Sequence, residues 1–171
     1  MINSLANILA IRIKSKVPEH PASVAVLQYS LLFILNSLSI IVLTMCISLF
    51  TGKIFETFVA LTAFAVLRQV SGGYHLKSGL LCIIISTTVI VLLSFTDCNS
   101  TVTMSLNIAS AILVLMFAPS RIERQTRIPA RYFPLLKVMA LCLIIISGVI
   151  SYPVLAMTFF AQSLTLIRIG R

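Results

Sequence analysis

Apolar residues of this chain fall into six runs separated by short polar segments, at residues 24–50, 54–67, 78–95, 100–118, 135–151 and 154–167. A helix needs about 20 predominantly apolar residues to cross the hydrocarbon of a bilayer. With tilt and flanking residues, the first, third, fourth and fifth runs reach about that length, whereas the second and sixth have only about fourteen residues each. The pattern predicts an all-α fold, a polytopic membrane helical bundle of about six transmembrane helices.

The N-terminal segment has a different pattern. Its apolar residues recur at helical spacing, at Ile2, Leu5, Ile8 and Leu9, and three basic residues follow them, Arg12, Lys14 and Lys16. This pattern is typical of an amphipathic helix that lies in the headgroup plane, here over residues 1–17, and Pro18 and Pro21 end it. Because the basic residues follow the apolar ones and no small-residue cleavage site comes after them, we expect this segment to be retained.

The composition identifies lipid as the solvent of most of the chain. Of the 171 residues, 59% are apolar and 10% are charged, with a mean hydropathy of +1.10. Soluble domains are about half apolar and a quarter charged. Since no internal repeat or low-complexity stretch is visible, residues 1–171 are expected to form a single domain, with the helical bundle over residues 18–171.

The charges predict an orientation. The chain has 13 Lys and Arg against 4 Asp and Glu, but they punctuate apolar runs, so we interpret them as topology signals and expect no nucleic-acid partner. Cytoplasmic loops of membrane proteins carry an excess of basic residues. If the chain has six spans and both ends in the cytoplasm, twelve of the 13 Lys and Arg residues are cytoplasmic. These are Arg12, Lys14, Lys16, Arg68, Lys77, Arg121, Arg124, Arg127, Arg131, Lys137, Arg168 and Arg171, and Lys53 alone lies outside.

The same charges bear on the two short runs. Omitting the second crossing would move the basic segment at 121–137 to the other side of the membrane, so the second run is expected to cross. Omitting the sixth would move only Arg168 and Arg171. Charge therefore requires the second span and does not require the sixth.

One segment combines reactive side chains with conformationally special residues. It runs from Arg68 to Cys82, with the sequence RQVSGGYHLKSGLLC, at the predicted cytoplasmic turn between the second and third spans. Gly72 and Gly73 break the helix and permit positive φ angles. His75 is the histidine beside an apolar span, and Cys82 lies about one turn inside the third run. The other cysteines, Cys46, Cys98 and Cys142, lack CxxC spacing, so we predict no disulfide framework, metal site or cofactor.

The pair His75 and Cys82 could supply a nucleophile and its base. A free thiol, with a pKa of ~8.5, is mostly protonated at neutral pH and needs such a base. On an unbroken helix the two residues would be about 10 Å apart along the axis, which is too far for a hydrogen bond. The chemistry therefore requires that His75 belong to the irregular Gly-Gly turn and that the helix begin near Lys77 or Ser78, where its N-terminus would also stabilise a thiolate.

Each of these features also has an interpretation without chemistry. A histidine at a membrane boundary can be an interfacial anchor, a cysteine inside a span can simply pack, and Gly72-Gly73 can be a plain tight turn. Arg68 and Lys77 can be topology signals only.

The partners of the dyad are not decided by spacing. Gln69, Ser71 and Ser78 could orient the imidazole or donate to an oxyanion, and Glu19 and Glu123 are the carboxylates on the predicted cytoplasmic side. Two asparagines inside the spans, Asn36 and Asn107, are expected to form hydrogen bonds between helices.

The segment from Arg68 to Cys82 resembles the signature of the accessory gene regulator protein B family (AgrB-like), membrane cysteine endopeptidases of quorum sensing in Gram-positive bacteria. The resemblance extends to the length of the chain, the basic N-terminal segment, the six spans and the basic loop before the fifth span. Carried over by position, it implies Cys82 as nucleophile, His75 as its catalytic partner, and Arg68 and Gly73 as residues needed for activity. We group Gly72, Gln69 and Ser78 with them as supporting residues.

The resemblance implies an activity, a substrate and a location. The activity is cleavage of a small amphipathic propeptide of the AgrD type, with an acidic C-terminal region, at the cytoplasmic edge of the bacterial cell membrane. A thioester acyl-enzyme would then pass its acyl group to an internal Cys or Ser of the peptide, which gives a cyclic thiolactone or lactone autoinducer precursor. Four basic residues, Arg121, Arg124, Arg127 and Arg131, could bind the acidic region or could only fix topology. The resemblance also implies a homodimer, for which the sequence has no GxxxG motif.

Two other classes of function remain open. A peptide transporter or exporter without proteolytic activity would carry intramembrane charges along a path, and the spans have almost none. A non-catalytic membrane scaffold would leave Cys82 unreactive. Other intramembrane protease classes fit poorly because the sequence lacks HExxH, GxGD and GxSx motifs.

Overall fold

The computed structural model describes residues 2–19, 21–73, 78–120 and 129–167. Within these ranges the chain forms seven α-helices, one short 3-10 helix (Ala130–Tyr132) and no strand. The α-helices are α1 (Ile2–Lys16), α2 (Val24–Thr51), α3 (Ile54–Ser71), α4 (Gly79–Ser94), α5 (Ser100–Phe117), α6 (Phe133–Ile150) and α7 (Pro153–Leu164). The all-α prediction is confirmed, and the helices after α1 follow the six apolar runs in order.

The lengths of two helices differ from prediction. By length and composition, the helices suited to cross a membrane are α2, α3, α5 and α6, whereas α4 and α7 are shorter apolar helices. The sequence pattern therefore underestimated the helix length of the second run, which is 18 residues, and overestimated that of the third, which is 16 residues. The helix α3 continues past the last apolar residue of its run through Arg68 and ends only at Gly72, whose φ is 76°. The apolar run ends before Arg68, but no helix-breaking residue occurs before Gly72, so the helix continues to that point.

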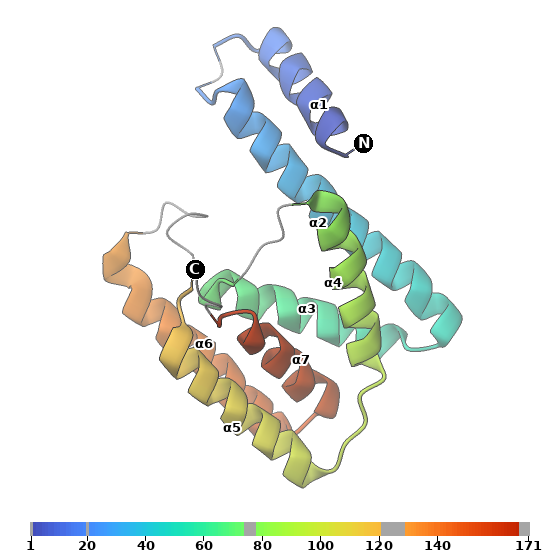
Figure 1. Cartoon of the computed structure of the whole chain (residues 1–171), viewed down its shortest axis with the longest axis vertical. Helices are drawn as coiled ribbons and strands as arrows, with labels where there is room; N and C mark the ends of the chain where they lie inside the picture. The colour runs from blue at the N-terminus through green and yellow to red at the C-terminus, as the bar shows by residue number, and fades with distance from the viewer. Residues whose placement is uncertain (1, 20, 74–77, 121–128, 168–171) are drawn as a thin grey trace.

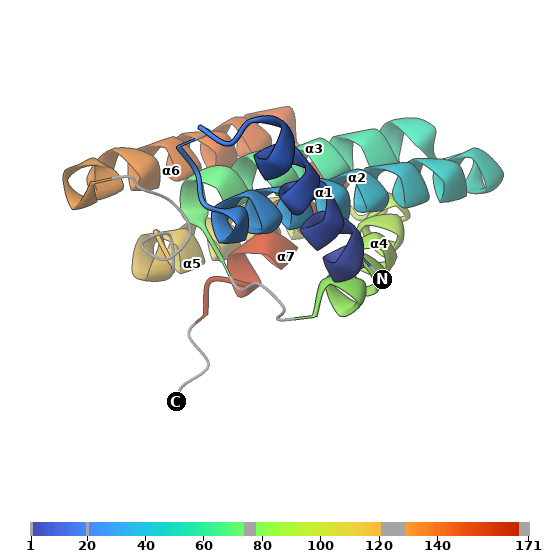
Figure 2. The ribbon, with the colours of Figure 1, turned by 90° about the horizontal axis from the view of Figure 1, so that it is seen from above.

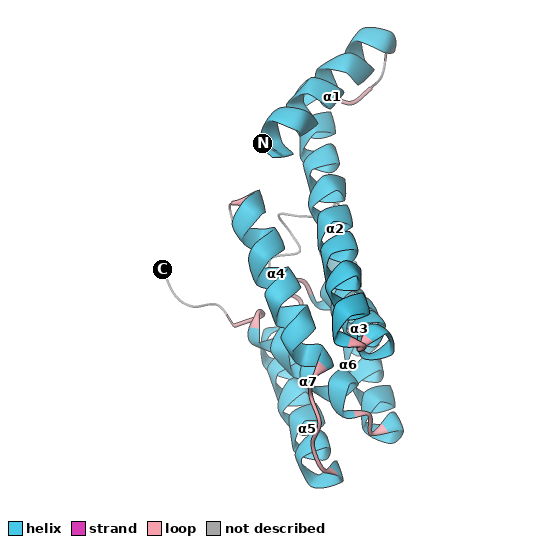
Figure 3. Ribbon diagram, turned by 90° about the vertical axis from the view of Figure 1, so that its right-hand side faces the viewer, coloured by secondary structure: helices cyan, strands magenta, loops and turns pink. Residues whose placement is uncertain are grey.

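The helices form two groups that meet along α3 (Figure 1). In one group α7 lies between α3 and α5 and also contacts α4 and α6. In the other, α2 and α4 lie side by side, and α1 folds back along the first half of α2 (Figure 3). Seen from above, α7 lies at the lower edge of its group, beside α5 and below α3 and α6 (Figure 2). Six of the twelve residues of α7 are buried. The last helix is thus the most enclosed, although it is the shortest of the seven α-helices.

The predicted N-terminal helix is present and packs on the bundle. Its small residues Ala6 and Ala10 are fully buried, and α1 contacts both α2 and the beginning of α4. Several of its larger apolar residues, Leu5, Ile8 and Ile11, are exposed. A lipid surface would accept these side chains, and the position of α1 in the headgroup plane stays a prediction.

The distribution of polar residues is the reverse of that in a water-soluble bundle. Many fully buried side chains are polar, such as Thr44, Ser110 and Thr158, whereas Phe50 and Val149 are 91% and 82% exposed. In lipid, exposed apolar side chains carry no hydrophobic penalty, and small or hydroxylated residues allow helices to approach closely. The arrangement fits an integral membrane protein.

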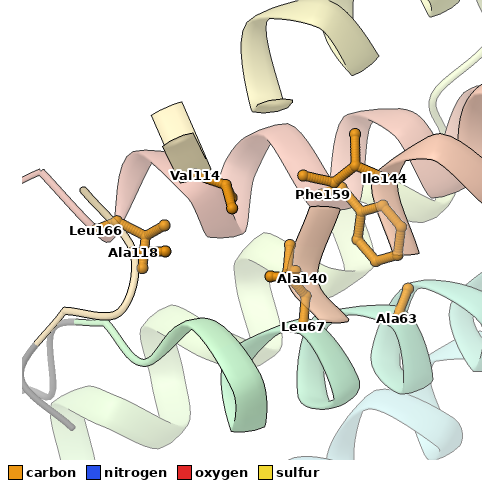
Figure 4. Packing of buried hydrophobic residues seen from close by; sticks show 8 residues of the cluster. All are labelled: Ala63, Leu67, Val114, Ala118, Ala140, Ile144, Phe159 and Leu166. Carbon is orange, nitrogen blue, oxygen red and sulfur yellow. The ribbon is translucent and has the colours of Figure 1, made fainter. Parts of the chain in front are cut away.

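The main core joins α3, α5, α6 and α7 (Figure 4). Small side chains alternate with larger ones in it, and its members are Ala63, Leu67, Val114, Ala118, Ala140, Ile144, Phe159 and Leu166. A second cluster, formed by Ala60, Ile90, Leu93 and Val154, ties α4 to α3 and α7. Both clusters include residues of α7, so this helix packs against the other helices through both apolar clusters.

Contacts sort the helix ends into two sets, as alternate crossing of a membrane requires. At one end of the bundle, the last residues of α3 bond to Ser120 after α5 and to Gln162 near the end of α7. At the other end, Phe55 at the beginning of α3 packs against Tyr152 before α7, at 6.4 Å between ring centroids. Lys53, the one basic residue predicted outside, pairs there with Glu56 at 3.1 Å.

The expectation that two asparagines join helices is wrong for Asn107. Its Nδ2 donates to the carbonyl of Thr103 in its own helix at 3.0 Å, and its Oδ1 has no partner. The Oδ1 of Asn36 has none either. Hydroxyl groups behave in the same local way, since Thr158 and Ser110 bond to carbonyls four residues earlier. Polar side chains inside the bundle therefore serve mainly their own helices.

Truncation of Phe159 should destabilise the bundle far more than truncation of Phe50. The Phe159 ring is 4% exposed in the core and the Phe50 ring is 91% exposed. We expect Phe159→Ala to lower the free energy of unfolding by about 3 to 5 kcal/mol, because it leaves a cavity. Phe50→Ala should change it by about 0.5 kcal/mol or less, because lipid or detergent fills the space. Detergent-titrated unfolding in micelles measures both, and equal losses would contradict the assignment of the core.

The predicted orientation places Cys98, between α4 and α5, on the outer side of the membrane. A membrane-impermeant maleimide added to intact cells should label the half-buried Cys98, and Cys98→Ser should remove that label. Labelling that appears only after the membrane is permeabilised would reverse the orientation.

Candidate active site

A cavity of about 360 Å³ lies between α2, α3 and α4 and contains Cys82. Most of its lining is apolar: Phe33, Ile40 and Ile41 from α2, Leu61, Phe64 and Ala65 from α3, and Ile90 from α4. The polar lining consists of Ser37, Arg68, Gln69, Cys82 and Ser86. Three residues predicted from one stretch of sequence, Arg68, Gln69 and Cys82, thus face a single space from two helices.

Arg68 brings a positive charge to this cavity. It lies close enough to Cys82 for the two groups to interact electrostatically. Its guanidinium carbon is 5.8 Å from the centroid of the Phe64 ring, one turn earlier on α3. A cation over an aromatic face gains about 0.5 to 2 kcal/mol. The ring therefore helps to keep the guanidinium in the cavity that Cys82 also lines.

Cys82 lies in the first turn of α4. The helix begins at Gly79 with Ser78 as its N-cap, and the Cys82 amide donates to the Ser78 carbonyl at 3.0 Å. A helix boundary between positions 75 and 82 is what the dyad required, and this prediction is confirmed. Gly79 also lets α2 approach, since a Cβ at this position would lie 3.1 Å from the amide atoms of Asn36. The beginning of α4 is thus held against α2, beside the cavity.

The Gly72-Gly73 turn is buried and is bonded to a distant loop. The Gly72 amide donates to the Arg68 carbonyl at 2.9 Å, which ends α3. The Gly73 amide donates to the Ser120 carbonyl at 3.1 Å, and the Ser120 amide donates to the Ser71 carbonyl at 2.9 Å. These bonds form a parallel β-bridge between Gly72 and Ser120. The turn after α3 and the residue that follows α5 are therefore one unit.

The helix α7 completes this unit. The Nε2 of Gln162, a fully buried side chain, donates to the Gly72 carbonyl at 2.8 Å. Gly73 has a φ of 140°, and a Cβ there would lie 2.6 Å from the Thr165 Oγ1 and 3.2 Å from the Gln162 Nε2. Only glycine fits both the backbone angle and the space. The predicted need for Gly73 thus has a steric reason, which is the end of α7.

Other predicted site residues are less constrained or lie outside the described ranges. Ser78 is exposed and its side chain makes no cap hydrogen bond, and Gln69 is also exposed at the edge of the cavity. Arg131 is exposed just before α6, with its guanidinium carbon 4.8 Å from the Tyr132 ring centroid. His75, Arg121, Arg124 and Arg127 fall outside the residues that the structure describes.

Sequence reasoning missed the residues that hold the turn, Gln162 and Ser120, and the cavity hydroxyls Ser37 and Ser86. A weak signal for Gln162 was available, because it is the one amide side chain in the run 154–167. Inside an apolar span such a group is expensive to bury and therefore has a partner. Nothing in the local pattern identifies that partner as Gly72, which lies 90 residues earlier.

Comparison with known proteins gives one family. The family model described as accessory gene regulator B matches residues 2–169. An AgrB-like protein from Halalkalibacterium halodurans is 28% identical over 120 residues, which cover 70% of this chain. The match spans 61% of that relative's own length, less than two thirds of it. No solved structure matches the chain.

The contact of Gly73 with α7 predicts that an added methyl group is costly at this glycine. Gly52 also has a positive φ, of 70°, but nothing lies within 4 Å of the position that a Cβ would occupy there. Gly52→Ala should bear left-handed backbone strain alone, about 1 to 2 kcal/mol. Gly73→Ala should lower the free energy of unfolding by more than Gly52→Ala, because the clash with Thr165 is added. Unfolding of both variants in micelles measures the difference, and equal losses would show that α7 does not press on the turn.

Proposed function

This chain belongs to the accessory gene regulator B family, and on that basis we propose that it is a membrane-embedded cysteine endopeptidase that processes a quorum-sensing propeptide. The family match runs over almost the whole chain, from residue 2 to residue 169. Cys82 is the proposed nucleophile and His75 its catalytic partner. The observation that carries the proposal is the common cavity of Cys82 and Arg68.

The surroundings of the four cysteines support the choice of Cys82. Cys46 and Cys142 are exposed on helices α2 and α6, on surfaces suited to lipid, and Cys98 is half-buried in the loop after α4. Cys82 combines a cavity, a neighbouring guanidinium and a position in the first turn of a helix. A cation and a helix N-terminus both stabilise negative charge on sulfur, which is the nucleophilic form of a cysteine.

The proposed reaction has two acyl transfers. The sulfur of Cys82 attacks the scissile carbonyl, the C–N bond breaks, and the new amine leaves with a proton delivered by His75. An internal thiol or hydroxyl of the peptide then gives up its proton, attacks the thioester and displaces the Cys82 sulfur. The products are the released C-terminal fragment, a cyclic thiolactone or lactone, and the free enzyme, which takes up the proton that the internal thiol or hydroxyl gave up. The presence of Arg68 in the same cavity supports a role for it in stabilising negative charge on the sulfur or on the carbonyl oxygen of the intermediate.

The apolar lining of the cavity supports a substrate with apolar side chains next to the scissile bond. A volume of about 360 Å³ is at the lower end of the range for small-ligand pockets, enough for one or two large side chains but not for a folded domain. A largely apolar site with few waters also favours acyl transfer to the peptide over hydrolysis of the thioester. The substrate we propose is an amphipathic propeptide of the AgrD type that lies on the cytoplasmic face of the cell membrane.

The basic segment between α5 and α6 is proposed to attract the acidic part of this peptide. Of its four arginines, Arg131 lies in the described ranges and is exposed. The β-bridge at Ser120 joins the beginning of the segment to the turn after α3. Arg121 follows Ser120 directly in the sequence, so an acidic region that reaches Arg121 would come close to the proposed catalytic turn.

Replacement of Cys82 tests the proposal. In liposomes containing the protein and an amphipathic propeptide of the AgrD type, Cys82→Ala should reduce cleavage by at least about a thousandfold, because the nucleophile is lost. His75→Ala should have a comparable effect. Mass spectrometry of the wild-type protein should find the acyl group on Cys82. Cys142→Ala is the matched control and should cleave at the wild-type rate.

Two outcomes would reject this proposal. Cleavage by Cys82→Ala at the wild-type rate excludes the sulfur as nucleophile. Movement of uncleaved peptide across the membrane, unaffected by Cys82→Ala, would favour a peptide exporter.

A further inference from the structure

The turn after α3 is held from three sides. Its own helix binds the Gly72 amide, Ser120 pairs with the backbone of Ser71 and Gly73, and Gln162 binds the Gly72 carbonyl. Two of these attachments are backbone to backbone and persist with any side chain. The third depends on the identity of one residue on α7.

Gln162 is unusual among the polar side chains of the bundle. Other buried side chains, such as those of Thr158, Asn107 and Ser71, form hydrogen bonds to residues four positions away. Gln162, which is fully buried, bonds to a residue 90 positions away. A buried amide group that has no partner loses its hydrogen bonds to water. The bond from the Gln162 Nε2 to the Gly72 carbonyl replaces one of these lost bonds, so the contact depends on this pair of residues.

The two halves of the Gln162 amide are used differently. The Nε2 donates to Gly72, and the acceptor Oε1 is buried without a partner. Because a carbonyl oxygen can only accept a hydrogen bond, the amide orientation is fixed by chemistry. Methionine has nearly the same length and volume, so Gln162→Met removes the donated bond and little else.

The helix that carries Gln162 is suited to hold a fixed position. Val154, Ala156, Thr158 and Phe159 are at most 4% exposed. Phe159 belongs to the main core and Val154 to the second cluster, so α7 is packed into both. Thr165, which follows Phe159 and Gln162 in the sequence, lies against Gly73. The carboxyl end of α7 is therefore a rigid support against which the turn rests.

We infer that Gln162 is a positioning residue of the active site, which acts by fixing the Gly72-Gly73 turn that connects the Arg68 end of α3 to the segment preceding Cys82. The inference rests on the proposed function. Gln162 touches neither the cavity nor the reacting atoms. It sets where the chain leaves α3, and thereby the relation of Arg68 to the beginning of α4.

Kinetics of Gln162→Met with the same propeptide test this role. We expect kcat to fall at least about tenfold, which corresponds to about 1.4 kcal/mol, with KM changed less than about twofold. Rates are expressed per protein that elutes as folded from size-exclusion chromatography, so that loss of folded protein does not contribute. Ser163→Ala is the matched control, since Ser163 is the buried neighbour on α7 and its Oγ has no partner. It should retain the wild-type kcat.

The variant Gln162→Glu separates a donated hydrogen bond from packing. A protonated carboxyl donates to the Gly72 carbonyl, whereas an ionised one repels it, and burial keeps the carboxyl protonated to higher pH than usual. The ratio of its kcat to the wild-type kcat should therefore be near one at about pH 6 and fall at least about tenfold by about pH 9. A purely spatial role of Gln162 gives a ratio that does not depend on pH.

The outcomes for Gln162 and for the proposed function are distinct. Hydrogen exchange of the peptide containing Val70 to Gly73 should be faster in Gln162→Met than in Ser163→Ala, whether or not the protein cleaves a peptide. Unchanged exchange, or a wild-type kcat in Gln162→Met, overturns the inference and leaves the proposed function intact. If exchange is faster in Gln162→Met but the wild-type protein cleaves the peptide no faster than Cys82→Ala, the proposed function is overturned. Gln162 would then hold the turn without any role in catalysis.

Discussion

A backbone that leaves its helix inside a lipid-facing bundle must find its hydrogen-bond partners in the protein, because hydrocarbon offers none. This constraint is met at one place in particular, the end of α3, where Ser71, Gly72 and Gly73 are all buried. Ser120 supplies one partner group on each side of the turn, and Gln162 supplies another. These bonds tie the turn to the ends of α5 and α7, and they thereby fix the direction in which the chain leaves α3.

The distribution of side chains explains why so few polar groups are available for this task. Several threonines and serines of the bundle, such as Thr158 and Ser110, bond to their own helices and let helices approach, whereas many large apolar side chains face outward. A charged group in such a setting is costly, and the described spans keep Arg68 at a cavity edge next to an aromatic ring. The polar groups of the cavity are therefore few, namely Cys82, Arg68, Gln69 and the hydroxyls of Ser37 and Ser86, with apolar walls around them.

Sequence reasoning reached local features and missed distant ones. The helix boundary before Cys82 followed from two glycines, whereas the grouping of Arg68 with Cys82 came from the family resemblance and not from the spacing of the residues. The extent of α3 did not follow, because hydropathy ended at Arg68 although the helix ended at Gly72. The roles of Gln162 and Ser120 could not be read from their neighbours, since their partners are set by how α5 and α7 pack. Hydrophobic periodicity specifies which residues form helices, and it does not specify which helix ends meet.

The separation of 90 residues between Gly72 and Gln162 also orders events during synthesis. At about 5 to 20 residues per second, the ribosome needs roughly 5 to 18 s to reach Gln162 after Gly72 has been made. Throughout that interval α3 and α4 exist without the helix that fixes the turn between them. A nascent chain thus carries Cys82, the proposed nucleophile, into the membrane before the support for its site exists, and completion of α7 acts as the last assembly step of the proposed active site.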